Sequence, residues 1–272
     1  MPVQPLTDGR KAWQIRDRKA TLVRWGGYLV AVAVFMWCWQ RISEATTWFF
    51  VWDAPRIAHD IGARAWPPRW SYMEKLWEPL WDTINIATIG TLLALIMAVP
   101  VAFLAARNTT PSRYFVRPVA LLIIVSSRSI NSLIWALLLV AIIGPGVMAG
   151  LVAIALRSVG FCAKLLYEAI EEIDHKEVEA IQATGASPLQ VMVYGIVPQI
   201  MPAFAGISVF RWDINIREST VLGLVGAGGI GLQLQSSLNT LAWPQVLLIL
   251  VVIFVTVILS EWVSAKVRGA II

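Results

Sequence analysis

The feature that most constrains this chain is a series of apolar runs, each about as long as a bilayer is thick. Six runs fall roughly at 22–40, 83–106, 119–143, 147–167, 191–212 and 246–264. A helix needs about 20 mostly apolar residues to cross the hydrocarbon core. Since 58% of the 272 residues are hydrophobic and only 14% are charged, a soluble domain is excluded. The runs predict an all-α polytopic membrane protein with about six transmembrane helices.

The basic residues indicate how these spans are oriented. Six spans return both termini to one side of the membrane, and that side holds thirteen Lys and Arg residues. The opposite side holds five, all between Arg41 and Lys75. Because cytoplasmic loops carry the excess of Lys and Arg, we expect both termini in the cytoplasm. The basic residues form no stripe interleaved with exposed aromatics, so we expect no nucleic-acid partner.

The chain divides into three parts by composition. Residues 1–24 form a basic cytoplasmic leader, residues 25–82 hold the first span and a Trp-rich external segment, and residues 83–272 form the transmembrane core. Trp rings collect at the headgroup level of a bilayer, and a Trp-Pro-Pro turn at 66–68 interrupts the external segment. We expect residues 42–82 to lie along the membrane surface.

Catalytic and metal-binding chemistry finds little support in the sequence. Cys38 and Cys162 stand far apart inside apolar runs, without a second Cys or His at ligand spacing. The two histidines, His59 and His175, fall outside the expected spans. An intramembrane enzyme needs a nucleophile with a base, or clustered metal ligands, within those spans. We therefore expect no disulfide, no bound metal and no catalytic residue.

Glycines crowd residues 219–245, which carry no charge. We expect a broken or re-entrant segment there, because non-helical backbone at membrane depth survives only beside protein or a water-filled cavity. Gly226, Gly228 and Gly231 also match the G-x-G-x-x-G pattern of dinucleotide sites. Such a site needs an acidic residue about 20 positions later, and the first one here is Glu261. Close helix packing and a flexible gate both fit better, and the candidate gate residues are Gly226, Gly228, Gly229 and Gly231.

The densest charge lies in the loop between the fourth and fifth runs. There residues 179–184 are helix-forming, Gly185 ends that helix, and Ser187 with Pro188 starts another. Glycine permits positive φ and lets another backbone approach closely. The loop therefore predicts a helix, a bend and a second helix outside the membrane, where a short exposed helix can fit a partner's groove. A solvated helix face is the plainer alternative.

This loop resembles the ATPase-docking loop of bacterial ABC importer permeases. Their pattern reads E-A-A, three residues, G, nine residues and I-x-L-P. The matching residues are Glu179, Ala180, Gly185 and Pro198, and we add Ala186, which follows the glycine, to the expected docking loop. The chain departs from the pattern at Ile181, Gly195 and Val197.

Longer stretches extend the likeness. The segments at 168–174, 183–187, 211–217 and 221–225 make residues 80–265 similar to the phosphonate and phosphite permease subfamily. The resemblance implies a type I ABC importer permease architecture in the bacterial inner membrane. It also implies a homodimer, two ATP-binding subunits that dock on residues 179–198, and an external binding protein that delivers the substrate.

The same resemblance implies the cargo and the energy source. The cargo would be a phosphorus oxyanion (phosphonate, phosphite or phosphate) moved by alternating access, with methionine or another small solute as the alternative. The chain has no G-x-x-x-x-G-K-[ST] phosphate loop, so ATP and Mg²⁺ are expected on the partner ATPase and no cofactor on this chain.

Charged side chains inside apolar runs are candidates for a substrate path. Each costs about 2.5–3.5 kcal/mol to insert at a helix centre, so it usually faces the bundle interior or a wet cavity. Arg128 lies in a polar patch with Ser127 and Asn131, and Arg with hydroxyl and amide donors recognises oxyanions. A packing role fits Arg128 equally well. Arg157 in the fourth run is likewise divided between pathway and structure.

The fifth run adds a charged face and two prolines. Asp213 and Arg217 are four residues apart on one helical face, where pairing offsets part of the burial cost, so we favour a structural pair. Arg211 and Asn215 share a face that is placed to line an outer gate. Pro198 and Pro202 bend a helix that must move, and we take them as candidate hinges. The full candidate path is Ser127, Arg128, Asn131, Arg157, Arg211, Asn215 and Arg217.

Overall fold

A computed structural model describes residues 3–5, 11–13 and 18–271. The rest of the expected basic leader, at 1–2, 6–10 and 14–17, lies outside the described residues. The chain forms two compact units, residues 1–62 and residues 63–272. The first unit contains two short antiparallel strands and two helices, of which the second runs just past the boundary: β1 (Val3–Pro5), β2 (Lys11–Trp13), α1 (Arg18–Ala45) and α2 (Trp48–Ala65).

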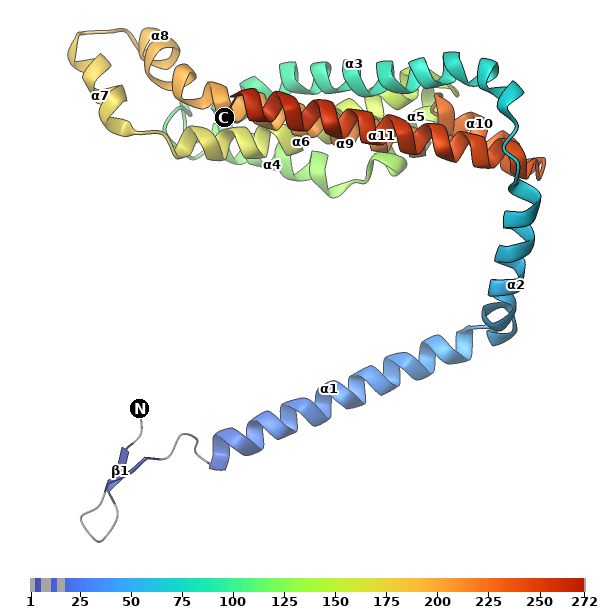
Figure 1. Cartoon of the computed structure of the whole chain (residues 1–272). Helices are drawn as coiled ribbons and strands as arrows, with labels where there is room; N and C mark the ends of the chain where they lie inside the picture. Colours follow the sequence, from blue (N-terminus) through green and yellow to red (C-terminus); the bar gives the residue numbers. More distant parts are fainter. Residues whose placement is uncertain (1–2, 6–10, 14–17, 272) are drawn as a thin grey trace. The chain divides into compact units, whose positions relative to one another are not determined.

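The second unit is a helical bundle. Its longer helices are α3 (Met73–Ala105), α4 (Val116–Ser129), α5 (Ser132–Ile143), α6 (Val147–Glu171), α9 (Val197–Leu222) and α11 (Trp243–Ile271). Its short helices are α7 (His175–Ala183), α8 (Pro188–Val191) and α10 (Ile230–Asn239), with 3-10 turns at Trp70–Tyr72 and Gly223–Val225 and a π-helical turn at Met192–Ile196. Within the bundle, α7, α8 and the C-terminus lie at one end, and α10 lies with the start of α3 at the other (Figure 1).

The described part of the chain has five helices long and apolar enough to cross a membrane, and six spans if one bent pair counts as a span. The all-α polytopic prediction is therefore confirmed. The third run, however, is not the single helix that we expected at 119–143, because α4 and α5 meet there at 88°. Asn131 leaves the helical conformation and its side chain accepts a hydrogen bond from Leu133 N, so a new helix begins at the break.

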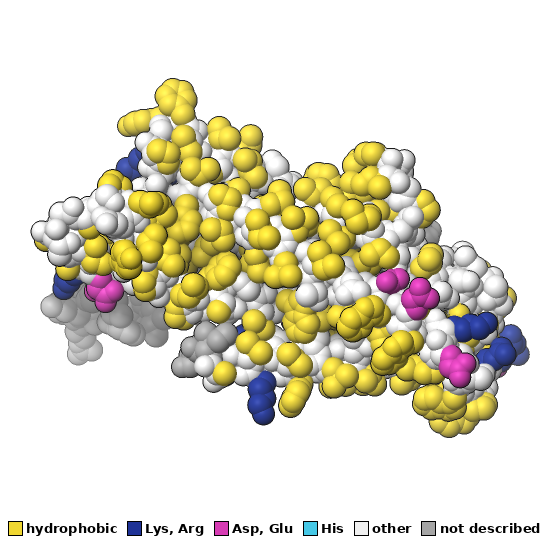
Figure 2. All heavy atoms as spheres, turned by 90° about the horizontal axis from the view of Figure 1, so that it is seen from above, with side chains coloured by type: hydrophobic (Ala, Val, Ile, Leu, Met, Phe, Trp, Pro, Cys, Tyr) yellow, Lys and Arg dark blue, Asp and Glu magenta, His cyan; other side chains and the backbone are white. Residues whose placement is uncertain are grey.

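The face of the molecule in Figure 2 is mainly hydrophobic, with few charged side chains.

The expected external segment at 42–82 is helical over most of its length, and its place relative to the membrane stays a prediction. Residues 73–82 form the first turns of α3, ten positions before the apolar run begins. Leu76 is fully buried there, in a cluster with Ile230, Leu248 and Ile249. Contacts with α10 and α11 therefore extend the helix beyond the reach of the hydrophobic signal.

Small residues allow the helices of the bundle to approach closely. A Cβ at Gly90 would lie 3.0 Å from the Ile154 side chain, which joins α3 to α6. A Cβ at Gly160 would lie 2.5 Å from the carbonyl oxygen of Ile124, which joins α6 to α4. Such contacts are the usual basis of helix association in lipid, because the acyl chains are as apolar as the side chains.

The glycine-rich stretch after α9 is broken, as expected. Gly226, Gly228 and Gly229 have φ values of 86°, 81° and 74°, a region that side chains disfavour. Gly231, in the first turn of α10, lies against the carbonyl oxygen of Thr220, where a Cβ would collide. Close packing is therefore confirmed for this segment, whereas its role as a gate stays a prediction.

We expect Gly160→Ala to destabilise the protein by about 1–3 kcal/mol, because the added methyl must push α4 away from α6. The readout is the thermal unfolding midpoint of the purified protein in detergent. Gly206→Ala is the matched control, since Gly206 lies in α9 and a Cβ added there would meet no atom within 4 Å. Equal midpoints for the two variants would contradict the close α4–α6 contact.

Candidate functional site

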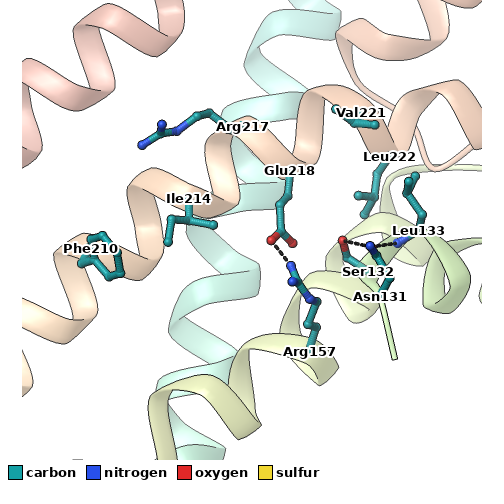
Figure 3. A pocket seen from close by; sticks show the side chains of 10 residues that line it. All are labelled: Asn131, Ser132, Leu133, Arg157, Phe210, Ile214, Arg217, Glu218, Val221 and Leu222. Carbon is teal, nitrogen blue, oxygen red and sulfur yellow. Dashed lines mark hydrogen bonds and ion pairs between the residues drawn. The ribbon is translucent and has the colours of Figure 1, made fainter. Parts of the chain in front are cut away.

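A cavity of about 620 Å³, with both polar and apolar walls, opens beside α9 at the break between α4 and α5. Side chains from α5, α6 and α9 line it (Figure 3). The lining residues are Asn131, Ser132, Leu133, Arg157, Phe210, Ile214, Arg217, Glu218, Val221 and Leu222. Three of these residues were candidates for a substrate path by sequence: Asn131, Arg157 and Arg217.

The centre of the cavity is an ion pair between two helices. Arg157 of α6 points toward Glu218 of α9 and forms an ion pair with its carboxylate (Figure 3). The Arg157 side chain is 30% exposed and the Glu218 side chain 17%. The second carboxylate oxygen of Glu218 lies 3.5 Å from a guanidinium nitrogen of Arg211. One carboxylate therefore serves two arginines.

Arg211 and Asn215 form the buried part of this network. The Arg211 side chain is 3% exposed, its Nε donates to Ser158 Oγ at 2.9 Å, and its guanidinium lies 5.1 Å from the centre of the Phe161 ring. Asn215 is fully buried and donates from Nδ2 to Thr91 Oγ1 at 2.7 Å and to Ser158 Oγ at 3.1 Å. These two residues fasten α9 to α3 and α6. We expected both residues to line the substrate path, and their hydrogen bonds show that they also hold the helices together.

The expected pair of Asp213 with Arg217 is present. Asp213 is buried and also accepts a hydrogen bond of 2.8 Å from Ser260 Oγ, which ties α9 to α11. The Arg217 side chain is 47% exposed, and it projects away from Glu218 (Figure 3). This pair is thus electrically balanced on its own and separate from the Arg157 cluster.

The other three candidates lie near the α4–α5 break. The Ser127 hydroxyl donates to the Leu156 carbonyl oxygen and accepts from Gly160 N at 2.9 Å, so it joins α4 to α6. Arg128 is exposed, and no hydrogen bond or ion pair connects its side chain to another residue within the described ranges. Asn131 caps α5 at the rim of the cavity. We expected these three residues to act together, but the structure gives them separate roles. Ser127 joins two helices, Arg128 is an exposed charge, and Asn131 caps α5.

Sequence reasoning missed Glu218 as a site residue. It lies seven positions after Arg211, hence on the same side of α9, and that spacing was the available signal. The spacing does not predict the partner of Glu218, because Arg157 comes from α6, 61 positions earlier in the chain. Thr91 was missed for the same reason, and Ser158, although it stands next to Arg157 in the sequence, was not made a candidate, because a hydroxyl inside an apolar helix acquires a role only through a remote partner.

The charged loop between α6 and α9 forms the helix, bend and helix that we expected. Asp174 caps α7, Gly185 turns the chain at φ 80°, and Ser187 with Gln190 forms a capping box at the start of α8. Glu179 and Ala180 are exposed on α7. The expected docking surface is therefore open to solvent at the end of the bundle where α7 lies (Figure 1).

The loop is fastened to the start of α9. Gln199 accepts a hydrogen bond of 2.9 Å from Asp174 N and donates one of 2.7 Å to the carbonyl oxygen of Gly195. Gly195 lies in the π-helical turn before Pro198, and a Cβ there would be 3.3 Å from Ile181 Cδ1. Ile181 stands where the family pattern has Ala, and Gly195 stands where it has Ile. These two departures therefore lie against each other.

Comparison with known proteins gives consistent matches. Residues 90–269 match the family model described as binding-protein-dependent transport system inner membrane component. The chain is 39% identical over 241 residues to the phosphite transport system permease protein PtxC of Stutzerimonas stutzeri, covering 88% of this chain and 86% of that protein. It is 41% identical over 202 residues to the phosphate-import permease protein PhnE of Mycolicibacterium smegmatis, covering 74% of this chain and 38% of that protein.

A solved structure shares the fold. It is the inward-facing methionine ABC transporter MetNI, with a TM-score of 0.65 and 20% identity over 75% of this chain and 99% of the matched chain. At this identity the likeness concerns the fold alone.

Gly195→Ile should weaken the packing of α7 on α9, because the larger side chain needs the space of Ile181 and Val178. Ile181→Ala in the same chain should restore the packing by vacating that space. We expect a favourable coupling energy of about 0.5–3 kcal/mol in a double-mutant cycle. The measurement is protease resistance of the loop in the purified protein. Additive effects of the two substitutions would show that the two sites do not share a contact.

Proposed function

Because this chain belongs to the family of binding-protein-dependent transport system inner membrane components, and is thus the non-catalytic permease of an ABC importer, we propose that it imports a phosphorus oxyanion. The proposed cargo is phosphonate, phosphite or phosphate. Two relatives near 40% identity carry the names phosphite and phosphate permease. The observation that carries the proposal for this chain is the cavity in which Arg157 faces open space, since Arg recognises such anions through paired hydrogen bonds.

We further propose that two copies of the chain form a homodimer with both termini in the cytoplasm. A partly exposed Arg157 and an exposed Arg128 are costly next to lipid, and a second copy across the cavity would cover both. The excess of Lys and Arg on the side of the termini supports the orientation. An ATPase and an external binding protein complete the transporter, and ATP with Mg²⁺ belongs to the ATPase.

Transport by alternating access then requires a link from the ATPase to the cavity. The proposed docking loop comprises Glu179, Ala180, Gly185, Ala186 and Pro198. Gln199 holds this loop to the first turn of α9, and the same helix carries Glu218 in the cavity. Pro198 and Pro202 are the proposed hinges, and the glycines at 226–231 are the proposed gate. Movement of the loop would thus reach the cavity along a single helix.

The cargo is tested by uptake into proteoliposomes that contain the permease, its ATPase and its binding protein. We expect ATP-dependent uptake of labelled phosphite or phosphate, and competition by methylphosphonate but not by methionine. The physical reason is charge, since a zwitterion does not neutralise an unbalanced guanidinium. Uptake of methionine that is indifferent to all three phosphorus compounds would reject the proposed cargo and favour the alternative.

Gly185→Arg should lower uptake at least tenfold while the protein stays folded. Gly185 has no neighbour within 4 Å of a Cβ position, so the cost within the chain is only the strain of positive φ, about 1–2 kcal/mol. The long side chain instead obstructs the approach of the ATPase. Gly185→Asn is the matched control, because Asn tolerates this backbone conformation and should retain most of the uptake. Normal uptake by the Arg variant would remove the loop from the coupling path.

A further inference from the structure

The cavity beside α9 contains unequal numbers of positive and negative charges. Arg157 and Arg211 both pair with the carboxylate of Glu218, one at each oxygen. Asp213 does not correct the balance, because Arg217 and Ser260 engage it. Two guanidinium groups therefore share one carboxylate, and the cluster carries one surplus positive charge among the described residues.

The two arginines are not equivalent. Arg211 is buried and has Ser158 and the Phe161 ring as further partners. For Arg157, Glu218 is the one side-chain partner within the described part of the chain, and the guanidinium has five N–H donors. Arg157 also lines the cavity, so an anion that enters can reach its guanidinium.

We propose that Glu218 is an internal substitute for the transported oxyanion. It holds Arg157 while the cavity is empty, and the incoming oxyanion displaces its carboxylate from Arg157 while Glu218 remains paired with Arg211. A carboxylate and a phosphorus oxyanion present the same pair of acceptor oxygens to a guanidinium, so one can replace the other. The exchange breaks no covalent bond and moves no proton. It rests on the proposed function, because it takes the cargo to be an anion.

The charge balance gives this exchange a direction. A cargo bound as a monoanion neutralises the surplus positive charge, so the cluster loaded with a monoanion is better balanced than the empty one. Asn131 and Ser132 at the N-terminus of α5 also line the cavity, where the helix dipole favours an anion. The displaced carboxylate remains close by as a competitor. Its return to Arg157 would assist release, which a transporter needs as much as binding.

The experiment measures phosphite binding to the full-length chain in lipid nanodiscs, by isothermal titration calorimetry. We expect Glu218→Gln to bind phosphite at least tenfold more tightly than the wild type, because the amide keeps the shape of the side chain but no longer competes for Arg157. Arg157→Gln added to this variant should abolish the gain. Glu172→Gln is the matched control, since Glu172 is exposed and outside the cavity, and its affinity for phosphite should equal that of the wild type.

A second variant keeps the proposal testable if Glu218→Gln does not fold. Glu218→Asp retains the charge but shortens the reach to Arg157, so phosphite should bind severalfold more tightly than to the wild type. Phosphite binding by Glu218→Gln that is no tighter than that of the wild type overturns the displacement. If Glu218→Gln does not fold, the same result for Glu218→Asp overturns it. An equal gain in Glu172→Gln does so as well, because it would reflect charge in general. Phosphite uptake by the complete wild-type transporter is measured separately, and its absence would reject the proposed cargo rather than the displacement.

Discussion

The cost of placing charge in lipid determines how this bundle is assembled. α9 is polar on two sides, with Arg211, Asn215 and Glu218 on one and Asp213 on the other, and neither side can meet acyl chains without partners from other helices. Each partner group comes from a different part of the chain, with Thr91 on α3, Arg157 and Ser158 on α6, and Ser260 on α11. The polar side chains of α9 therefore require α3, α6 and α11 as its neighbours.

Hydrogen bonds between helices require the helix backbones to lie close together, and small residues permit that approach. Gly160, where α6 meets α4, leaves no room for a methyl group, and at Gly90, where α3 meets α6, a methyl would fit only if its neighbours moved slightly. Ser127 uses this closeness to bond carbonyl and amide groups of α6 directly. Packing and polarity are therefore not independent features of the fold: the glycines bring the backbones together, and the hydroxyls then have partners within reach.

Local signals in the sequence were sufficient for part of this structure. Positive φ at Gly185 and the pair of Asp213 with Arg217 depend on residues at most a few positions apart, and both are present. The break at Asn131 was also written locally, as a cap before an apolar run, but the hydrophobic signal on both sides obscured it. The role of Glu218 was beyond local reasoning, because it exists only where α6 and α9 meet.

Two departures of the loop from the family pattern, Ile181 and Gly195, meet in the structure. A larger residue at 181 and a smaller one at 195 are each unfavourable alone, but they lie against each other and their volumes compensate. This contact lies in the π-helical turn just before α9, where the carbonyl oxygen of Gly195 accepts a hydrogen bond from Gln199. From Gln199 to Glu218 the helix spans about 28 Å without interruption. Pro202, a proposed hinge, lies between these two residues, so a movement where α7 meets α9 would reach the carboxylate in the cavity through that hinge.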